Sequence, residues 1–141
     1  MPAKGSAEWK GDLKSGQGTF SAGDSLSGDY SFKSRFEDGP GANPEQLIAG
    51  AHASCFSMAL SNALAQAGHV PDSVRTEATV TLGRVDGAAA ITKIELTTRG
   101  RVPGLDEAEF QRLAEEAKRD CPVSKALAGV SDVTLQASLE G

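Results

Sequence analysis

Alternation of polar and apolar residues predicts short strands in the first third of the chain. Segments around Trp9 (residues 7–10) and Phe20 (residues 18–22) flank the turn-like sequence KGDLKSGQG, a pattern typical of a β-hairpin. In DYSFKSRFE, aromatic and polar residues alternate, which indicates a further strand. Its two faces would be Tyr30, Phe32, Ser34 and Phe36 on one side and Ser31, Lys33 and Arg35 on the other. We therefore expect Arg35 to face away from the aromatic side.

A long uncharged segment follows and predicts a helix over residues 44–67. Asn43 suits the N-cap, Pro44 the first helical position and Gln46 a capping-box-like pair, while Gly68 is a natural stop. Such a helix would extend about 36 Å. The sequence has no Lys, Arg, Asp or Glu from 46 to 71, yet its His, Ser, Asn and Gln residues make membrane insertion costly. We interpret it as a buried helix of a soluble protein.

This helix is apolar or small nearly all round, so one sheet would leave part of it uncovered. By packing alone, a second layer from a partner chain is expected. Further along, alternation over residues 74–82 and 91–98 around VDGA predicts a β-hairpin. Asp106 begins a predicted helix that ends near Pro122, a short helix follows through Leu127, and a last strand carries alternating apolar residues from 133 to 139. The pattern predicts one α+β domain over residues 1–141, with antiparallel strands.

Charge and composition exclude several classes of function. The formal charge of −5 is spread along the chain, and no basic cluster is interleaved with aromatics, which argues against a nucleic-acid partner. The opening MPAKGSAEWKGDL has neither an apolar export segment nor a cleavage site, so we expect a cytoplasmic protein. Thiols are kept reduced there, so the two cysteines are inert core residues, metal ligands or redox groups.

Cys55 lies in the uncharged helix, where a thiol is most simply a small buried hydrophobe. Burial would raise its pKa and leave it unreactive unless a cation lies beside it. Cys121 also points inward, at the start of a short helix whose free N–H groups favour a thiolate. The two thiols could meet in the fold, although 66 positions of separation say nothing about distance.

Other chemistry remains open at this point. His52 and Cys55 share a helix face, and with His69 and Cys121 they would make a Cys2His2 set, but the spacing matches no familiar zinc pattern. A hydrolase built on Cys55 and His52 lacks an obvious residue to orient the histidine. Arg35 and Glu45 taken singly are ordinary charged residues, and Glu45 lies about 15 Å along the helix axis from Cys55.

The blocks SRFEDGPGANPEQLIAGAHASCFSMALSNAL and VDGAAAITKIELTTRGRVPGLDEAEFQRLAEEAKRDCPVSKAL resemble the OsmC/Ohr family of hydroperoxide reductases, most closely its OsmC branch. The likeness extends over nearly the whole chain. It implies an α+β, OsmC-like fold, with antiparallel sheets around long buried central helices. It also implies an intertwined homodimer with two active sites at the subunit interface.

The resemblance further implies thiol peroxidase activity, with Cys55 in ASCFS as the peroxidatic cysteine and Cys121 in DCPVS as the resolving one. The family's arginine falls on Arg35 in SRFE and its glutamate on Glu45 after NP, where Gln46 stands at a position that is often a second glutamate. It implies no bound cofactor or metal, but an external dithiol reductant, typically a lipoyl group on a protein. Phe36, Phe56 and Met58 are candidates for lining a pocket for organic hydroperoxides. The alternative is a non-catalytic protein of the same fold that binds an apolar ligand.

Overall fold

The computed structural model describes residues 1–140, which divide along the sequence into two compact units between Leu47 and Ile48. The first unit holds a three-stranded antiparallel sheet of β1 (Gly5–Lys10), β2 (Gln17–Ala22) and β3 (Leu26–Tyr30), in the order β1-β2-β3. The predicted hairpin around Trp9 and Phe20 is therefore confirmed. The single domain expected from the sequence stays a prediction, because the residues of each unit mainly contact other residues of the same unit.

The expected strand through Phe36 is wrong beyond Tyr30. Residues Phe32–Phe36 form a short helix, α1, that begins at Ser31. Ser31 Oγ accepts the Ser34 backbone N–H at 3.1 Å, and Ser34 Oγ accepts the Ser31 N–H at 2.8 Å. This reciprocal capping box satisfies N–H groups that an extended strand would have paired with a neighbour. Local side-chain bonding thus outweighs the alternating pattern.

Helix α2 (Pro44–Gln66) matches the predicted long helix to within one residue. Asn43 Oδ1 accepts the backbone N–H of Gln46 at 2.8 Å, as expected for an N-cap. At the other end, the His69 N–H donates to the Leu64 carbonyl at 2.9 Å. By length and composition α2 would suit a membrane, but its Phe56, Leu60 and Leu64 belong to the core of the second unit. It is the core helix of that unit.

The second unit is built on a three-stranded sheet of β4 (Ser73–Val85), β5 (Ala88–Arg101) and β6 (Asp132–Leu139), in the order β4-β5-β6. Strands β4 and β5 form the predicted hairpin, joined by Asp86 and Gly87 with φ of 52° and 81°. Two residues with positive φ give a turn whose twist matches that of the strands.

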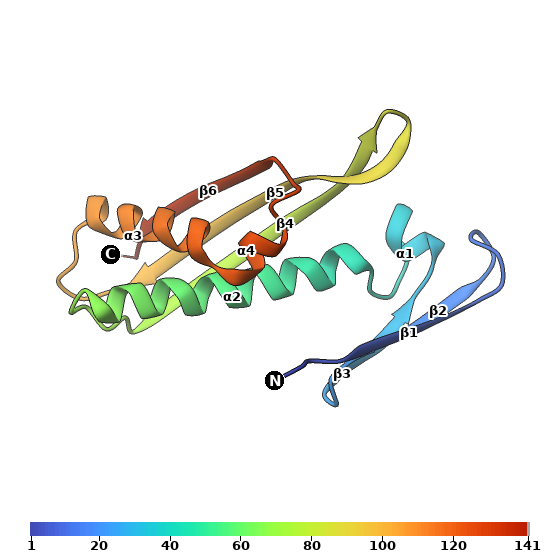
Figure 1. Ribbon diagram of the computed structural model, residues 1–141, viewed down its shortest axis with the longest axis horizontal. Helices are drawn as coiled ribbons and strands as arrows, with labels where there is room; N and C mark the ends of the chain where they lie inside the picture. The colour runs from blue at the N-terminus through green and yellow to red at the C-terminus, as the bar shows by residue number, and fades with distance from the viewer. Residues whose placement is uncertain (141) are drawn as a thin grey trace. The chain divides into compact units, whose positions relative to one another are not determined.

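The expectation of wholly antiparallel sheets is wrong for one ladder. Strand β6 pairs with β5 in parallel, from Lys93 opposite Asp132 to Gly100 opposite Leu139. Helices α3 (Glu107–Asp120) and α4 (Pro122–Ala126) lie between these strands in the sequence. They carry the chain back along the sheet, so that β6 runs in the same direction as β5 (Figure 1). A helical crossover of this kind permits parallel pairing, which a tight turn does not.

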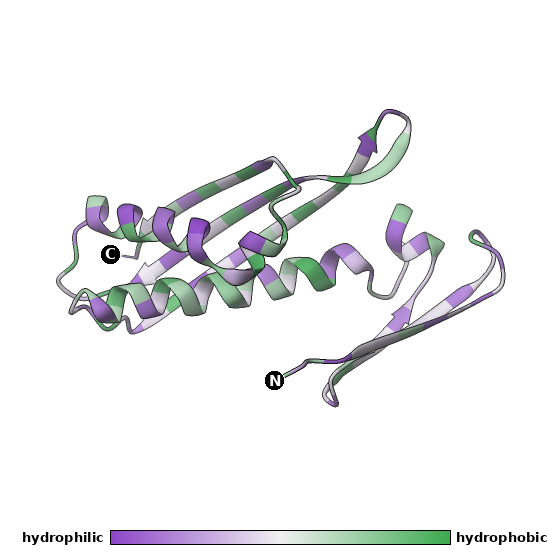
Figure 2. Cartoon of the chain, viewed as in Figure 1, coloured by the Kyte–Doolittle hydropathy of each residue, from purple (hydrophilic) through white to green (hydrophobic). Residues whose placement is uncertain are grey.

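Helices α2 and α3 share one core with the sheet of the second unit (Figure 1). The buried side chains come from α2, β5, α3 and the residue after β5: Phe56, Leu60, Leu64, Ile94, Leu96, Val102, Phe110, Leu113, Ala114 and Ala117. Helix α3 buries one face, and purple, hydrophilic residues dominate the rest of it in Figure 2, whereas α2 has few such residues. Asp106 caps α3 by accepting the Glu109 N–H at 2.8 Å, as predicted.

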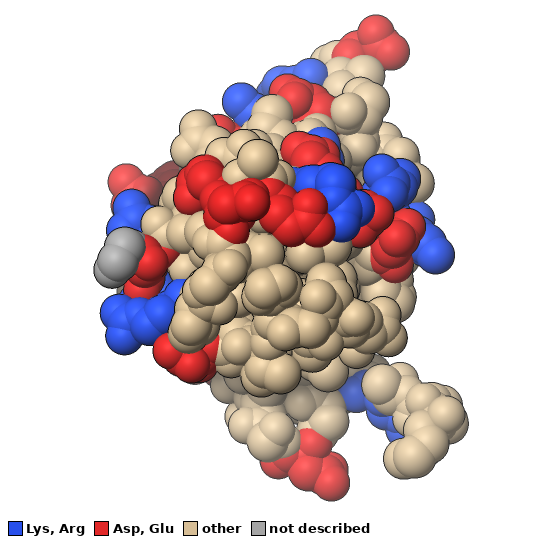
Figure 3. Space-filling view, turned by 90° about the vertical axis from the view of Figure 1, so that its left-hand side faces the viewer, with Lys and Arg blue, Asp and Glu red and all other residues tan. Residues whose placement is uncertain are grey.

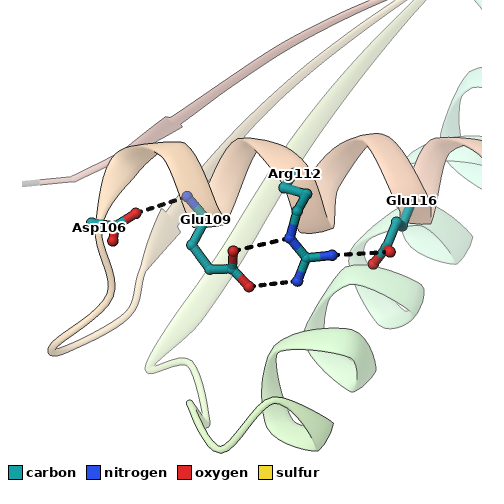
Figure 4. A network of polar contacts seen from close by, with 4 residues as sticks. All are labelled: Asp106, Glu109, Arg112 and Glu116. Carbon is teal, nitrogen blue, oxygen red and sulfur yellow. Dashed lines mark hydrogen bonds and ion pairs between the residues drawn. The ribbon is translucent and has the colours of Figure 1, made fainter.

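Charged side chains on the outer face of α3 pair with one another. Arg112 donates to the carboxylates of Glu109 and Glu116 from one guanidinium, next to the Asp106 cap (Figure 4). These bonds with Arg112 lower the pKa of Glu109, and the same bonds raise the pKa of Arg112. Figure 3 shows acidic and basic side chains mixed in a band beside a broad uncharged surface. Exposed pairs of this type contribute little to stability.

A tight contact between β5 and α3 gives the first testable prediction. A Cβ atom added to Gly100 would lie 2.4 Å from Cε1 of Phe110, a side chain without exposed surface. We expect Gly100→Ala to lower the free energy of unfolding by about 1–3 kcal/mol, because the buried ring has no free space into which to move. Urea unfolding would measure this, with Gly129→Ala, whose new Cβ meets nothing within 4 Å, as the matched control. Equal stability of the two variants would contradict this packing.

Candidate active site

In the first unit, Arg35 of α1 forms an ion pair with Glu45 in the first turn of α2. Arg35 donates from Nη2 at 2.8 Å and from Nε at 3.1 Å, both to Oε1 of Glu45. Glu45 is only 7% exposed, whereas Arg35 keeps part of its guanidinium open. The carboxylate therefore fixes the guanidinium through charge-assisted bonds and leaves other N–H groups of Arg35 free for a ligand.

Arg35 lies beside aromatic residues, so the expectation that it faces away from them is wrong. Its guanidinium carbon is 5.6 Å from the centre of the Phe36 ring, a distance that allows a cation–π interaction. Both residues line a cavity of about 390 Å³ in the first unit. The other lining residues are Trp9, Gly11, Leu13, Tyr30, Ser31 and Phe32. The helical turn of α1 produces this arrangement, because it places consecutive side chains only about 100° apart, whereas a strand sends them to opposite faces.

The second unit brings the two cysteines together. Cys55 of α2 and Cys121, the N-cap of α4, have their sulfur atoms 2.9 Å apart, joined by one S–H···S hydrogen bond. Both are free thiols, and Cys121 is fully buried while Cys55 is partly exposed. Little movement is needed to reach the separation of about 2.05 Å in a disulfide.

The two thiols differ in acidity. Burial raises the pKa of Cys55, and the contact with Cys121 raises it further. Burial also acts to raise the pKa of Cys121, but its polar interactions with Cys55, Ser124 and the Val123 backbone outweigh burial and leave that pKa lowered. The sequence predicted that N–H groups at the start of α4 would favour the Cys121 thiolate, and a lowered pKa of Cys121 agrees with that prediction. Within its own unit, Cys55 therefore needs a cation to become reactive.

His52 lies one turn before Cys55 on α2, fully buried. Its Nε2 is 2.7 Å from the hydroxyl of Ser124 on α4, and its Nδ1 has no hydrogen-bond partner among residues 1–140. Burial lowers the pKa of His52, which keeps the ring neutral. Among the described residues, no group of three or more His, Cys, Asp or Glu side chains is placed to hold a metal ion. The Cys2His2 interpretation thus has no support in the geometry.

The pocket candidates lie in three different environments. Phe36 lines the Arg35 cavity and is 42% exposed, Phe56 has no exposed surface, and Met58 is 74% exposed on α2. Sequence reasoning missed Trp9 and Tyr30 beside Arg35, and it missed Ser124, although CPVS was among the quoted motifs. The aromatic character of Trp9 and Tyr30 was visible in the sequence, but their closeness to Arg35 depends on the α1 turn.

Comparison with known proteins places this arrangement in a family. Residues 37–136 match the family model of OsmC-like proteins. The chain is 46% identical over 139 residues to "Peroxiredoxin OsmC" of Escherichia coli (strain K12), covering 97% of this chain and 96% of that protein. It is 42% identical over 98 residues to an organic hydroperoxide resistance protein of Xanthomonas axonopodis pv. citri, covering 69% and 67% of the two chains.

Solved structures agree with these sequence relationships. An organic hydroperoxide resistance protein from Elizabethkingia anophelis superposes with a TM-score of 0.77 at 25% identity, covering 99% of both chains. The organic hydroperoxide resistance protein OsmC from Legionella pneumophila gives a TM-score of 0.73 at 26% identity, covering 96% of each. The α+β fold, the family model and the near full-length relative all agree, and this chain belongs to the family of OsmC-like proteins.

Proposed function

We propose that this protein reduces organic hydroperoxides to alcohols through Cys55 and Cys121. The names of its relatives support a thiol-dependent peroxidase role. The single observation that carries the mechanism is the 2.9 Å contact between the two sulfur atoms, which come from different helices. Two free thiols at this distance can pass between the reduced and disulfide states without unfolding.

The reaction consists of two thiol steps. The Cys55 thiolate attacks the terminal oxygen of the hydroperoxide, the O–O bond breaks, and the alkoxide leaves and takes up a proton as the alcohol. Cys55 is then a sulfenic acid. The Cys121 sulfur attacks it, hydroxide leaves as water, and a Cys55–Cys121 disulfide forms. One peroxide has thus accepted two electrons and two protons from the thiol pair.

Arg35 and Glu45 supply the charge that Cys55 lacks in its own unit. We assign to Arg35 a hydrogen bond to the Cys55 thiolate, while Glu45 holds the guanidinium in place through its two bonds. An adjacent cation offsets the burial that raises the pKa of Cys55. The aromatic cavity around Arg35 suits the organic part of the substrate, with Phe36 in its wall. Contact of the substrate with Phe56 or Met58 stays a prediction.

The oxidised pair must be reduced before the next turnover. A dithiol achieves this by attacking the disulfide and closing its own ring, and we propose a lipoyl group carried on a protein as that reductant. No bound cofactor takes part in any of these steps. A cytoplasmic location would supply both the reductant and the reducing thiol pool that keeps Cys55 and Cys121 free.

Counting thiols tests the function directly. When the reduced protein is mixed with one equivalent of cumene hydroperoxide, we expect both thiols to disappear together as one equivalent of alcohol forms. Mass spectrometry after tryptic digestion should show a Cys55–Cys121 disulfide. If both thiols persist while peroxide is unchanged, the peroxidase function is excluded. In that case, retained binding of an apolar ligand by Cys55→Ser would favour a non-catalytic binding protein of the same fold.

We also propose that the protein is a homodimer, with the uncovered face of α2 as its contact. In the single chain α2 buries the face formed by His52, Phe56, Leu60 and Leu64. The opposite face is exposed but carries no charge, and it is formed by Gly50, Ala51, Ser54, Met58, Asn62 and Ala65. An uncharged face of small residues around a 74% exposed methionine is suited to close helix packing.

The dimer gives a separate prediction. We expect the wild-type protein to have twice the mass of the chain in light scattering, and Met58→Glu to shift it toward the monomer, because two carboxylates would face each other in the contact. Glu116→Ala, at a half-buried position on the outer face of α3, is the control and should leave the mass unchanged. A monomeric wild-type protein at micromolar concentration would refute the proposed contact.

A further inference from the structure

Leu13 is an exposed leucine that the steps above do not use. It lies in the loop between β1 and β2, and 60% of its surface is exposed. It also lines the cavity of about 390 Å³ to which Arg35 and Phe36 belong. Single exposed apolar residues are common and need no explanation. Phe36 is exposed as well, however, so two large apolar side chains meet at one cavity beside a cation.

Bonds made by Asp12 hold this loop, residues 11–16, in one shape. Its Oδ1 accepts the backbone N–H of Ser15 at 2.7 Å and the Ser15 hydroxyl at 2.6 Å. Its backbone carbonyl accepts the indole N–H of Trp9 at 3.1 Å and the N–H of Gly16 at 2.9 Å. Local bonds of this kind fix a turn without help from apolar packing. Leu13 therefore keeps its place although most of its surface is exposed.

The cavity lies at the loop end of the first sheet. Trp9, Gly18 and Tyr30 lie opposite one another on β1, β2 and β3. A Cβ atom added to Gly18 would lie 2.5 Å from Cε1 of Tyr30 and 2.7 Å from Cε3 of Trp9, and without one the two rings pack with their centres 5.4 Å apart. Because β1 leads into the loop and β3 into α1 at this end, Leu13 and Arg35 reach one cavity from different segments (Figure 1).

The residues of the cavity divide it into a polar and an apolar part. Among the described residues that line it, Arg35 alone is charged. Its N–H groups that do not bind Glu45 can donate to an oxygen of a ligand. Leu13 adds an aliphatic surface to a wall that is otherwise mostly aromatic. A ligand with one polar group and one hydrocarbon group matches this division.

We propose that Leu13 is a specificity-determining residue: held at the Arg35 cavity by the loop, its side chain contacts the hydrocarbon group of an organic hydroperoxide. Leu13 thereby favours peroxides with a bulky apolar group over hydrogen peroxide, which has none. That the ligand is a hydroperoxide rests on the proposed function, whereas the apolar subsite does not. Leu13 takes no part in the chemical step, because its side chain has no donor, acceptor or nucleophile.

Binding is measured first, without turnover. Trp9 is the only tryptophan of the chain and lines the cavity, so its fluorescence reports whether a ligand is bound there. The reduced protein is titrated with cumyl alcohol, the product expected from cumene hydroperoxide. We expect Leu13→Ser to raise Kd about threefold to tenfold, because part of the apolar contact of one leucine is lost. Leu13→Met keeps an apolar side chain of similar volume and should stay within about twofold of the wild type.

Two matched variants separate this contact from general effects on the fold. Leu26→Ser removes a leucine that is 50% exposed at the start of β3 and is not among the residues lining the cavity, so Kd should not change. Asp12→Ala keeps Leu13 and the carbonyl that binds Trp9, but it removes the bonds from Ser15. We expect it to raise Kd by at least about twofold, because binding must then order the loop. In a Leu13→Ser background the same change should have no further effect.

Turnover gives an independent measurement of the same contact. Leu13→Ser should lower kcat/KM for cumene hydroperoxide by about threefold to tenfold, as it raises Kd for the alcohol. It should leave kcat/KM for hydrogen peroxide within about twofold of the wild type, because that substrate has no hydrocarbon group to contact Leu13. A residue that only supported the fold would lower both values.

Two results would overturn the proposal. One is equal binding of cumyl alcohol by the wild type and Leu13→Ser, including no binding by either, and the other is an equal loss in Leu13→Ser and Leu26→Ser. Unchanged binding by Asp12→Ala would refute the part assigned to the loop. Failure of the peroxidase function would look different: no variant would consume peroxide, while binding of cumyl alcohol would still depend on Leu13. If peroxide is consumed but Leu13→Ser affects both peroxides equally, the function stands and the subsite is refuted.

Discussion

Cys55→Ser is expected to abolish peroxide reduction, lowering kcat/KM for cumene hydroperoxide by at least about 10³-fold. The serine hydroxyl keeps the shape of the side chain but is not ionised at neutral pH, so no nucleophile remains at this point of α2. The remaining thiol of Cys121 is fully buried and should not substitute for it. A coupled assay of peroxide consumption, with a dithiol as reductant, measures the loss.

Cys121→Ser is the matched variant, because it removes the other sulfur of the same 2.9 Å pair. It should consume one equivalent of peroxide and then stop, with Cys55 trapped as a sulfenic acid that a dimedone reagent labels. The wild type should show no such label, because the disulfide forms first. If Cys55→Ser consumed one equivalent and Cys121→Ser none, the roles of the two cysteines would be reversed. The lowered pKa of Cys121 makes this a real alternative outcome.

Arg35→Met is expected to give the second largest loss, about 10- to 100-fold in the rate of Cys55 oxidation. This is the effect of one charge-assisted hydrogen bond, about 1.5–3 kcal/mol. Without the guanidinium, burial keeps the pKa of Cys55 high, so the pH at which oxidation becomes fast should move upward. Stopped-flow measurement of a single turnover across pH would give both the rate and the shift.

A stability measurement accompanies this variant, because Arg35→Met leaves the nearly buried carboxylate of Glu45 without its partner. The double variant Arg35→Met with Glu45→Met removes both charges and should recover stability but not activity. Lys33→Met, an exposed cation on the same short helix, is the control. An equal rate for Arg35→Met and Lys33→Met would show that Arg35 does not act on the thiol.

Local signals in the sequence were enough to predict most of the helices and strands. Asn43 before Pro44 and Asp106 before Glu109 each mark a helix start whose capping bond spans three residues, so no distant partner is needed. The Asp86–Gly87 turn is similarly local, because only its own φ angles decide it. The family motifs predicted Cys55, Cys121, Arg35 and Glu45 as site residues in the same way, position by position along the chain.

The candidate site was less predictable because its contacts join distant residues. The alternation around Phe32 indicated a strand, and only the reciprocal bonds of Ser31 and Ser34 show why that segment turns into α1. Those bonds place Arg35 among aromatic residues rather than opposite them. The contact between Ser124 and His52 was hidden for a similar reason, since 72 positions separate the two residues.

The sequence by itself thus predicted which residues would carry the chemistry and determined where helices α2, α3 and α4 begin, because both signals lie in short stretches of neighbouring residues. The tertiary structure decided which of those residues meet. It placed Cys121 against Cys55, Arg35 on Glu45 and Ser124 on His52, and it paired β6 with β5 in parallel. The physical reason is that these contacts depend on how the helices pack on the sheets, and packing is set by the whole core rather than by any one segment.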